Sequence, residues 1–238
     1  MIVRLHNLSV RAPVINDVSA VAELINGCDS ADSSVCEYAE VDIRNAWQAL
    51  GFNLRTDAWV IVTNKGRIIG YADVRQSEND QLTMFLRVHP DFRGRGIGTL
   101  LVWLVEERAR QRAHCVSADV RVTLRSTVRS LSQTGHGLLE REGYTQVHSF
   151  WRIILETDEV SSHLSEKAQQ SSVLKVDIVA SLQNSASLIQ LRKRTGMYLM
   201  RQYDVYEKEL RAGKARPLAG DGEGREVVTD REAYSLTV

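Results

Sequence analysis

The stretch that decides the fold reads Val88-His89-Pro90-Asp91-Phe92-Arg93-Gly94-Arg95-Gly96-Ile97-Gly98-Thr99. Before it, apolar residues recur at every second position from Leu82 to Val88, which is typical of a β-strand. After it, apolar residues recur at helical spacing from Ile97 to Val105 and predict an amphipathic helix. Three glycines at alternate positions therefore lie where a strand gives way to a helix.

This arrangement predicts a phosphate-binding loop. Glycine leaves backbone amides uncovered and permits dihedral angles that other residues avoid. The positive end of the helix dipole also attracts an anion. A dinucleotide-binding loop is the nearest alternative, since Asp119 lies about 20 residues downstream, but that loop needs Gly-x-Gly-x-x-Gly. A nucleoside-triphosphate-binding loop is excluded because no Gly-Lys-Ser/Thr follows the glycines. A tight turn that binds no ligand is the remaining structural alternative.

The segment resembles the acetyl-CoA-binding motif of the GNAT acetyltransferase superfamily, Gln/Arg-x-x-Gly-x-Gly/Ala. Arg93, Gly96 and Gly98 match its defining positions, and Val88-His89-Pro90 matches the Val-x-Pro that precedes it. The resemblance implies acetyl-CoA as co-substrate, without a metal: the loop amides bind the diphosphate, and the preceding strand pairs with the pantetheine arm. The implied cofactor-binding residues are Leu86, Arg87, Val88, Arg93, Gly94, Arg95, Gly96, Ile97, Gly98 and Thr99.

The order of predicted elements over residues 1–157 also resembles that of a GNAT N-acetyltransferase domain. It reads βααβββαβαβ, with strands expected at 8–14, 59–62, 68–74, 82–88, 116–122 and 148–155. The predicted fold class is α/β (α+β): a GNAT fold with a mixed central sheet flanked by helices. A helical and strand extension follows at the C-terminal end.

The composition changes after this domain. Residues 158–180 are rich in Ser, Glu and Gln and are predicted to be a linker, and 211–238 a flexible tail. Between them, the helix–glycine–strand pattern of residues 139–150 recurs at 192–203. We therefore expect a partial second GNAT-like segment at 181–210, as in a tandem protein with a truncated second domain; a chance match is the alternative. Its apolar faces should pack on the first domain or on a partner subunit, which would make a homodimer.

The catalytic residues cannot be assigned from the sequence. Many GNAT enzymes protonate the departing thiolate with a tyrosine four residues before the glycine that follows the last helix, and this chain has Leu139 there. The family also has a frequent asparagine at the start of that helix, which is replaced by serine here. A strand amide, of Val88 or its neighbour, should stabilise the oxyanion. Candidate catalytic side chains are Tyr71, Asp73, Ser132 and His136, with Glu37 or Glu40 near the acceptor wall.

Composition limits the partners. The formal net charge of the 238 residues is zero, so bulk electrostatics do not favour nucleic acid, and the longest apolar run is too short to span a membrane. Cys28, Cys36 and Cys115 lack metal-ligand spacing and predict reduced thiols in the cytoplasm. The expected function is an N-acetyltransferase acting on a primary amine of a small molecule or protein. The alternative is a catalytically weak acyl-CoA-binding sensor or scaffold.

Overall fold

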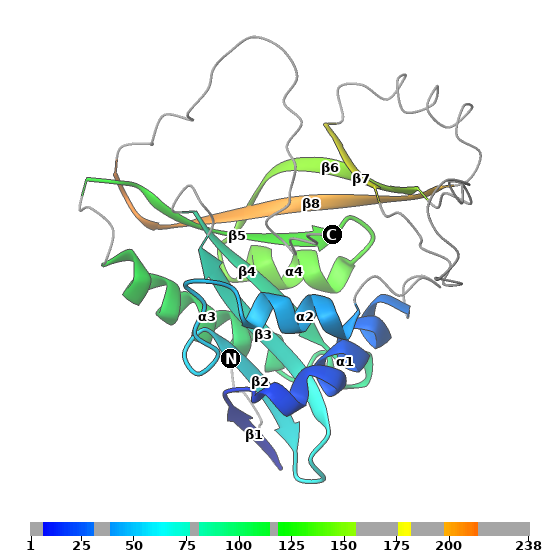
Figure 1. Cartoon of the computed structure of the whole chain (residues 1–238). Coiled ribbons are helices and arrows are strands. Elements are labelled where there is room, and N and C mark those ends of the chain that lie inside the picture. The colour runs from blue at the N-terminus through cyan, green and yellow to red at the C-terminus, as the bar shows by residue number, and fades with distance from the viewer. Residues whose placement is uncertain are drawn as a thin grey trace, which may run out of the picture.

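The computed structural model describes residues 7–30, 39–76, 81–114, 119–155, 176–181 and 198–213. Its centre is an eight-stranded sheet with the order β1-β2-β3-β4-β5-β8-β6-β7 (Figure 1). β4 and β5 pair in parallel, and the other neighbours pair antiparallel. The predicted mixed sheet flanked by helices is confirmed.

The strands and helices have the following bounds. The strands are β1 Leu8–Arg11, β2 Ala58–Thr63, β3 Ile68–Gln76, β4 Leu82–Val88, β5 Val122–Arg129, β6 Thr145–Leu155, β7 Val176–Ser181 and β8 Tyr198–Arg211. The α-helices are α1 Val18–Ser30, α2 Glu40–Trp47, α3 Ile97–Ala113 and α4 Gln133–Arg141, with short 3-10 turns at Ile15–Asp17 and Pro90–Phe92. Within the described part of the chain, no helix is long and apolar enough to cross a membrane.

Two apolar cores lie on the two faces of the sheet. On one face, Met84 and Val88 of β4 pack with Leu101 of α3 and Leu139 of α4. On the other face, Phe85 packs with residues of β3, α1 and α2. This division follows from the strand itself, because successive side chains point to opposite faces.

The strand after α3 begins later than the predicted 116–122. β5 starts at Val122, and its buried positions include Val122, Leu124 and the small polar Ser126. Ser126 interrupts the apolar alternation of Val122 and Leu124 along β5. Residues 115–118 lie outside the described residues.

The domain boundary expected after residue 157 does not end the sheet. β8 lies between β5 and β6 and pairs with both, so this part of the expected second segment completes the first domain. β7, which falls at the end of the expected linker, pairs with β6 at the edge of the same sheet. Val205 and Tyr206 of β8 are buried, and this burial explains why the strand packs here. Residues 156–175, 182–197 and 214–238 of the expected linker, second segment and tail are outside the described residues.

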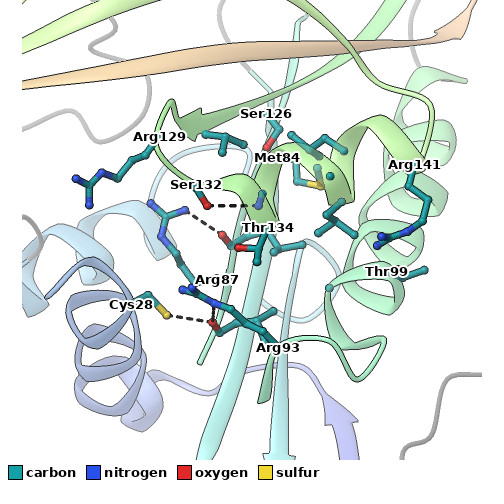
Figure 2. A pocket seen from close by; sticks show the side chains of 18 of the residues that line it. Cys28, Met84, Arg87, Arg93, Thr99, Ser126, Arg129, Ser132, Thr134 and Arg141 are labelled. Carbon is teal, nitrogen blue, oxygen red and sulfur yellow. Dashed lines mark hydrogen bonds between the residues drawn. The ribbon is translucent and has the colours of Figure 1, made fainter. Parts of the chain in front are cut away.

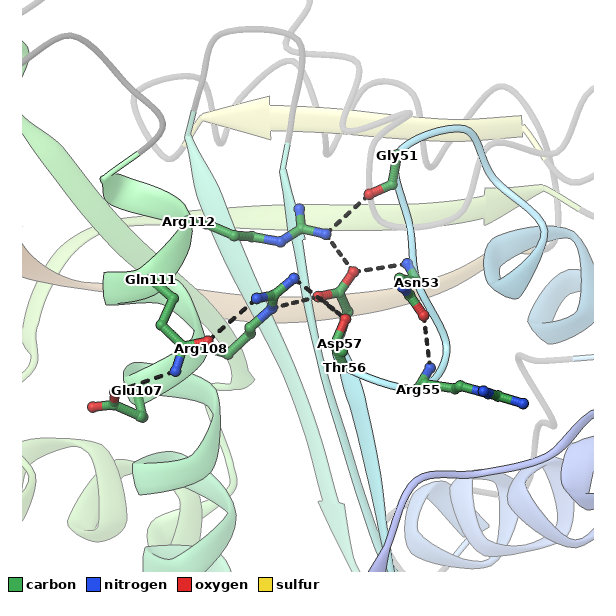
Figure 3. Close-up of polar contacts among 9 residues, drawn as sticks. All are labelled: Gly51, Asn53, Arg55, Thr56, Asp57, Glu107, Arg108, Gln111 and Arg112. Atoms are coloured by element: carbon green, nitrogen blue, oxygen red, sulfur yellow. Dashed lines mark hydrogen bonds and ion pairs between the residues drawn. The ribbon is translucent and has the colours of Figure 1, made fainter.

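A buried carboxylate joins the loop before β2 to the C-terminal half of α3 (Figure 3). Asp57 is fully buried and accepts hydrogen bonds from Nε of Arg108 at 2.8 Å and from the guanidinium of Arg112. The backbone N–H of Asn53 donates to the same carboxylate at 2.7 Å. Burial opposes ionisation of Asp57, but this N–H and the two arginines outweigh it and lower its pKa below the ordinary value.

Candidate functional site

The site lies where β4 and β5 part. Their ladder contains only Leu82 to Met84 paired with Leu124 to Ser126, although both strands continue beyond it. A cavity of about 400 Å³ occupies the space between them. Its lining comes from β4, β5, the glycine-rich loop and α4, with Cys28 from α1 (Figure 2).

The backbone of β4 presents its amides to this cavity. The N–H of His89 donates to the carbonyl of Ile69 in β3 at 2.9 Å. Successive residues of a strand point their N–H groups to opposite sides, so those of Leu86 and Val88 face away from β3 and into the gap. The carbonyl of Val88 points the same way, since it accepts from Nε of Arg93 at 3.2 Å and from Sγ of Cys28 at 3.3 Å.

The glycine-rich loop forms one end of the cavity. Gly94 has a φ of 74° and Gly96, the N-cap of α3, has a φ of 84°, both in the left-handed region that glycine tolerates. A Cβ at Gly94 would meet nothing within 4 Å, so the chain is bare on that side. The first N–H groups of α3 have no partner inside the helix, as at any helix start. Together these features form a cradle for an anion.

Eight of the ten predicted cofactor-binding residues line the cavity: Leu86, Arg87, Val88, Arg93, Gly94, Gly96, Gly98 and Thr99. The side chains of Arg95 and Ile97 lie elsewhere. Arg95 is exposed, lies over the ring of Phe92 and donates to the carbonyl of Asp91 at 3.0 Å. Ile97 is buried in the core between the sheet and α3, so only its backbone can face a ligand.

Tyr71 and Asp73, the candidates on β3, form a buried network away from the cavity lining. The Tyr71 hydroxyl accepts from Nε1 of Trp47 at 2.8 Å and donates to Asp73 at 2.6 Å. Asp73 is also paired with Arg75 at 2.7 Å. This network joins β3 to α2. Glu40 is an exposed residue in the first turn of α2, and Glu37 is outside the described residues.

The other two candidates lie at α4 but point in different directions. Ser132 lines the cavity and caps α4 by accepting the N–H of Gly135 at 3.3 Å. His136 turns toward β8, with Nδ1 at 2.8 Å from the hydroxyl of Tyr206 and Nε2 at 3.2 Å from the carbonyl of Ser130. Tyr206 also donates to Glu140 at 3.0 Å; its burial and this carboxylate raise its pKa to about 12.

The remaining lining residues were not among the predicted site residues. They are Cys28, Met84, Ser126, Thr127, Val128, Arg129, Thr134, Gly135, Gly137, Leu138, Leu139 and Arg141. The β5 members would follow from placing that strand correctly, because it must run beside β4. Leu139 is 3% exposed and presents an aliphatic side chain at the position where many GNAT enzymes have tyrosine. Among the residues described, no cluster of His, Cys, Asp and Glu could hold a metal ion.

Comparison with known proteins agrees with this geometry. Residues 18–135 match the sequence model of the family described as Acetyltransferase (GNAT) family. A GCN5-related N-acetyltransferase from Sphaerobacter thermophilus has a TM-score of 0.72 at 21% identity, covering 88% of this chain and 98% of the other. No curated protein matches.

Two further similar structures carry acetyl-CoA. One is yncA, a putative acetyltransferase of Salmonella typhimurium with its cofactor acetyl-CoA (TM-score 0.53, 16% identity, 90% and 99% of the two chains). The other is a phosphinothricin acetyltransferase of Sinorhizobium meliloti in complex with AcCoA (TM-score 0.52, 14% identity, 90% of this chain and 95% of the other). The fold and site thus define an acyltransferase. The chain belongs to the GNAT family of acetyl-CoA-dependent acetyltransferases.

Proposed function

We propose that this protein is a cytoplasmic N-acetyltransferase that moves the acetyl group of acetyl-CoA to a primary amine by direct attack. The observation that carries the proposal is the shared cavity, which joins the anion cradle at Gly94 and Gly96 to the inward amides of Leu86 and Val88. A diphosphate at one end and a thioester along the strand fit this arrangement. Cys28 is a buried thiol outside any disulfide, which is consistent with a reducing compartment.

Nine of the ten residues of the sequence prediction form the proposed cofactor site; the tenth, Arg87, turns its side chain to the face of the sheet covered by α1 and α2. The amides of Gly94 to Thr99 would hold the diphosphate, with Arg95 and Ile97 contributing through their backbone. Arg141 lines the same cavity, and Figure 2 draws it beside Thr99, so it would add positive charge near the phosphates. The pantetheine arm would run along Leu86 and Val88 in place of the missing β5 partner.

The proposed chemistry needs an uncharged amine, a stabilised oxyanion and a thiolate that can leave. The Val88 or Leu86 amide would donate to the oxyanion as the amine attacks. A CoA thiol with a pKa of about 8.5 can leave without full protonation, so Leu139 does not prevent transfer. Among the described residues that line the cavity, none is a carboxylate or an imidazole. We therefore propose that the amine loses its proton to water.

This requirement favours amines of low pKa. A lysine-type amine with a pKa of about 10.4 is about 99.9% protonated at neutral pH, which costs about 4–5 kcal/mol in available nucleophile. An α-amine with a pKa of about 8 costs only about 1 kcal/mol. We therefore place α-amines ahead of lysine side chains among possible acceptors.

A sensor or scaffold that binds acyl-CoA without turnover is the second candidate. Leu139 favours it, since an apolar side chain stands in the cavity wall where a proton donor is common in the family. Both candidates predict binding of CoA, so binding alone does not separate them.

The decisive experiment measures thiol release from acetyl-CoA with a panel of amines, beside calorimetry of acetyl-CoA binding. Gly94→Glu places a carboxylate where the diphosphate should lie and should abolish both signals. Gly66→Glu is the matched control, because Gly66 also has a positive φ and open space where a Cβ would stand, but lies in the β2–β3 turn. Binding without amine-dependent release would support the sensor. Absence of binding in folded wild-type protein would overturn both.

A further inference from the structure

Two arginines flank the cavity on the same face of the sheet. Phe85 of β4 packs toward α1 and α2, and Arg87 shares its face because it lies two positions along the strand. On β5, Leu124 and Val128 pack toward α3, so Arg129 points to the opposite face, that of α1 and α2. Both arginines line the cavity.

The strand register brings these arginines to equivalent positions. Leu82 pairs with Leu124 and Met84 with Ser126, a constant offset of 42 positions. The same offset takes Arg87 to Arg129, beyond the point where the ladder ends. The two residues therefore lie on either side of the gap through which the strands part. The Arg87 guanidinium lies over the Phe85 ring, 4.4 Å from its centroid, and donates to the carbonyl of Leu86 at 2.9 Å.

A third arginine adds to the charge on this face. In the ladder between β5 and β8, Arg129 lies directly opposite Tyr203, and residues opposite each other in a ladder share a face of the sheet. Arg201 lies two positions from Tyr203 on that face and is only 4% exposed. Three neighbouring strands thus each carry an arginine near the end of the gap.

Two carboxylates on the strands of this face are paired with arginines that do not line the cavity. Asp73 on β3 is paired with Arg75, and Glu207 on β8 with Arg121 and Arg125. The described cavity lining contains Arg87, Arg93, Arg129 and Arg141 and no carboxylate. Such a lining gives the cavity a positive potential that attracts an anion.

The cofactor's diphosphate does not explain the whole of this charge. Figure 2 shows Arg141 and Thr99 on one side of the cavity and Arg129 and Cys28 on the other. The glycine loop is followed directly by Thr99, so the diphosphate belongs on the first side. Arg87 and Arg129 lie on the face covered by α1 and α2, across the sheet from the core that α3 and α4 share.

We propose that Arg87 and Arg129 bind an anionic group of the acceptor, so that the substrate is a small amine carrying a carboxylate or a phosphoryl group. This inference rests on the proposed acetyltransferase function. Guanidinium groups bind both anions through paired hydrogen bonds. Arg87 lies between Leu86 and Val88 in sequence, so an anion held there keeps the amine near the amides assigned to the thioester.

The test uses the full-length protein and matched amines. L-amino acids are compared with their carboxamides, and 2-aminoethylphosphonate with propylamine, by thiol release from acetyl-CoA. The wild type should prefer the anionic member of at least one pair, and the pair that responds identifies the anion. Arg87→Gln and Arg129→Gln should each raise KM for that acceptor by roughly ten- to a hundred-fold. Their KM for acetyl-CoA should stay unchanged, as should all parameters of the control Arg55→Gln, an exposed arginine in the loop before β2.

Three results would overturn the inference. Equal turnover of charged and neutral amines would leave the acetyltransferase standing and remove the anionic acceptor. Weaker acetyl-CoA binding in both variants would assign the arginines to the cofactor. If no amine is turned over, the proposed function fails. Calorimetry of CoA-saturated protein with the same amine pairs then tests the anion site by itself. The wild type must bind the anionic members, and both variants must lose that binding; otherwise the inference fails too.

Discussion

Nζ of Lys208 lies 2.6 Å from Oε1 of Glu106, which joins the last described strand to the helix that follows the glycine loop. Glu106 is 3% exposed, and Arg110 neutralises its other oxygen at 2.7 Å. Lys208 also donates to the carbonyl of Glu142 at 2.8 Å, at the end of α4. One side chain of β8 therefore fixes both helices that frame the cavity.

Lys208→Met should lower the free energy of unfolding by about 2 kcal/mol, because a buried carboxylate loses one of its two cations. Denaturant unfolding measures the change. Lys65→Met, at an exposed position in the β2–β3 turn, is the control and should change stability by less than about 0.5 kcal/mol. Equal effects of the two variants would show that β8 is not held to α3 by this contact.

Asp57→Asn should lower the free energy of unfolding at neutral pH by about 3–5 kcal/mol, since Arg108 and Arg112 lose a buried partner. The pKa of Asp57 is lowered in the folded state, so its contribution is complete above the unfolded value of about 3.9. The contribution is lost as the pH falls through the folded pKa. The stability difference between wild type and variant should therefore shrink in acid.

Denaturant unfolding at several pH values from neutral to acid follows this difference. Asp91→Asn is the control, because its carboxylate is 77% exposed. A difference between wild type and Asp57→Asn that persists unchanged into acid would exclude the ion pairs as its source.

The phosphate-loop region was predictable because its signal is local. Glycines, Pro90 and flanking periodicity lie within a few residues of one another, and eight predicted residues line the cavity. β8 was not predictable as the partner of β5, since residues 156–197 separate it from β6. The sequence indicates a strand in this region, but only the pairing of β8 with β5 and β6 shows that this strand completes the sheet of the first domain.

The surroundings of the catalytic candidates were not predictable, for a related reason. The environment of Tyr71 depends on Trp47, 24 residues away, and that of His136 on Tyr206, 70 residues away. Sequence spacing cannot say whether such a residue faces a cavity or a neighbouring strand. The position of Ser132 was predictable, because a helix cap lies at the end of its own helix and does not depend on residues far away in the sequence.

Gly98→Ala should raise KM for acetyl-CoA, although alanine is the better helix former. A Cβ at Gly98 would lie 2.9 Å from Cδ2 of Leu138, so the Leu138 side chain, which lines the cavity, must shift and change the cavity's shape. Gly27→Ala is the matched control within α1: its Cβ would meet nothing within 4 Å, so it should stabilise the protein by about 0.5–1 kcal/mol. Unchanged acetyl-CoA kinetics in Gly98→Ala would show that this helix contact does not set the cavity's shape.

Ser132→Ala should lower the free energy of unfolding by about 1 kcal/mol because α4 loses its cap. Ser132→Asn should restore that stability, since asparagine caps helices equally well. Thermal unfolding and thiol release are measured for both. If the rate follows stability across the three proteins, Ser132 acts only as a cap; a rate lost in both variants would instead give its hydroxyl a part in the reaction.

The pH dependence of kcat/KM should follow the acceptor and not the enzyme. The described cavity lining offers no carboxylate or imidazole as a base, so the reactive species is the fraction of amine already deprotonated. The rate should therefore rise about tenfold per pH unit below the amine pKa and level off above it. Two acceptors whose pKa values differ by about two units, measured by thiol release, should give inflections displaced by the same amount. A common inflection for both would require a base on the enzyme, and the pH profile of Glu37→Gln would then test that candidate.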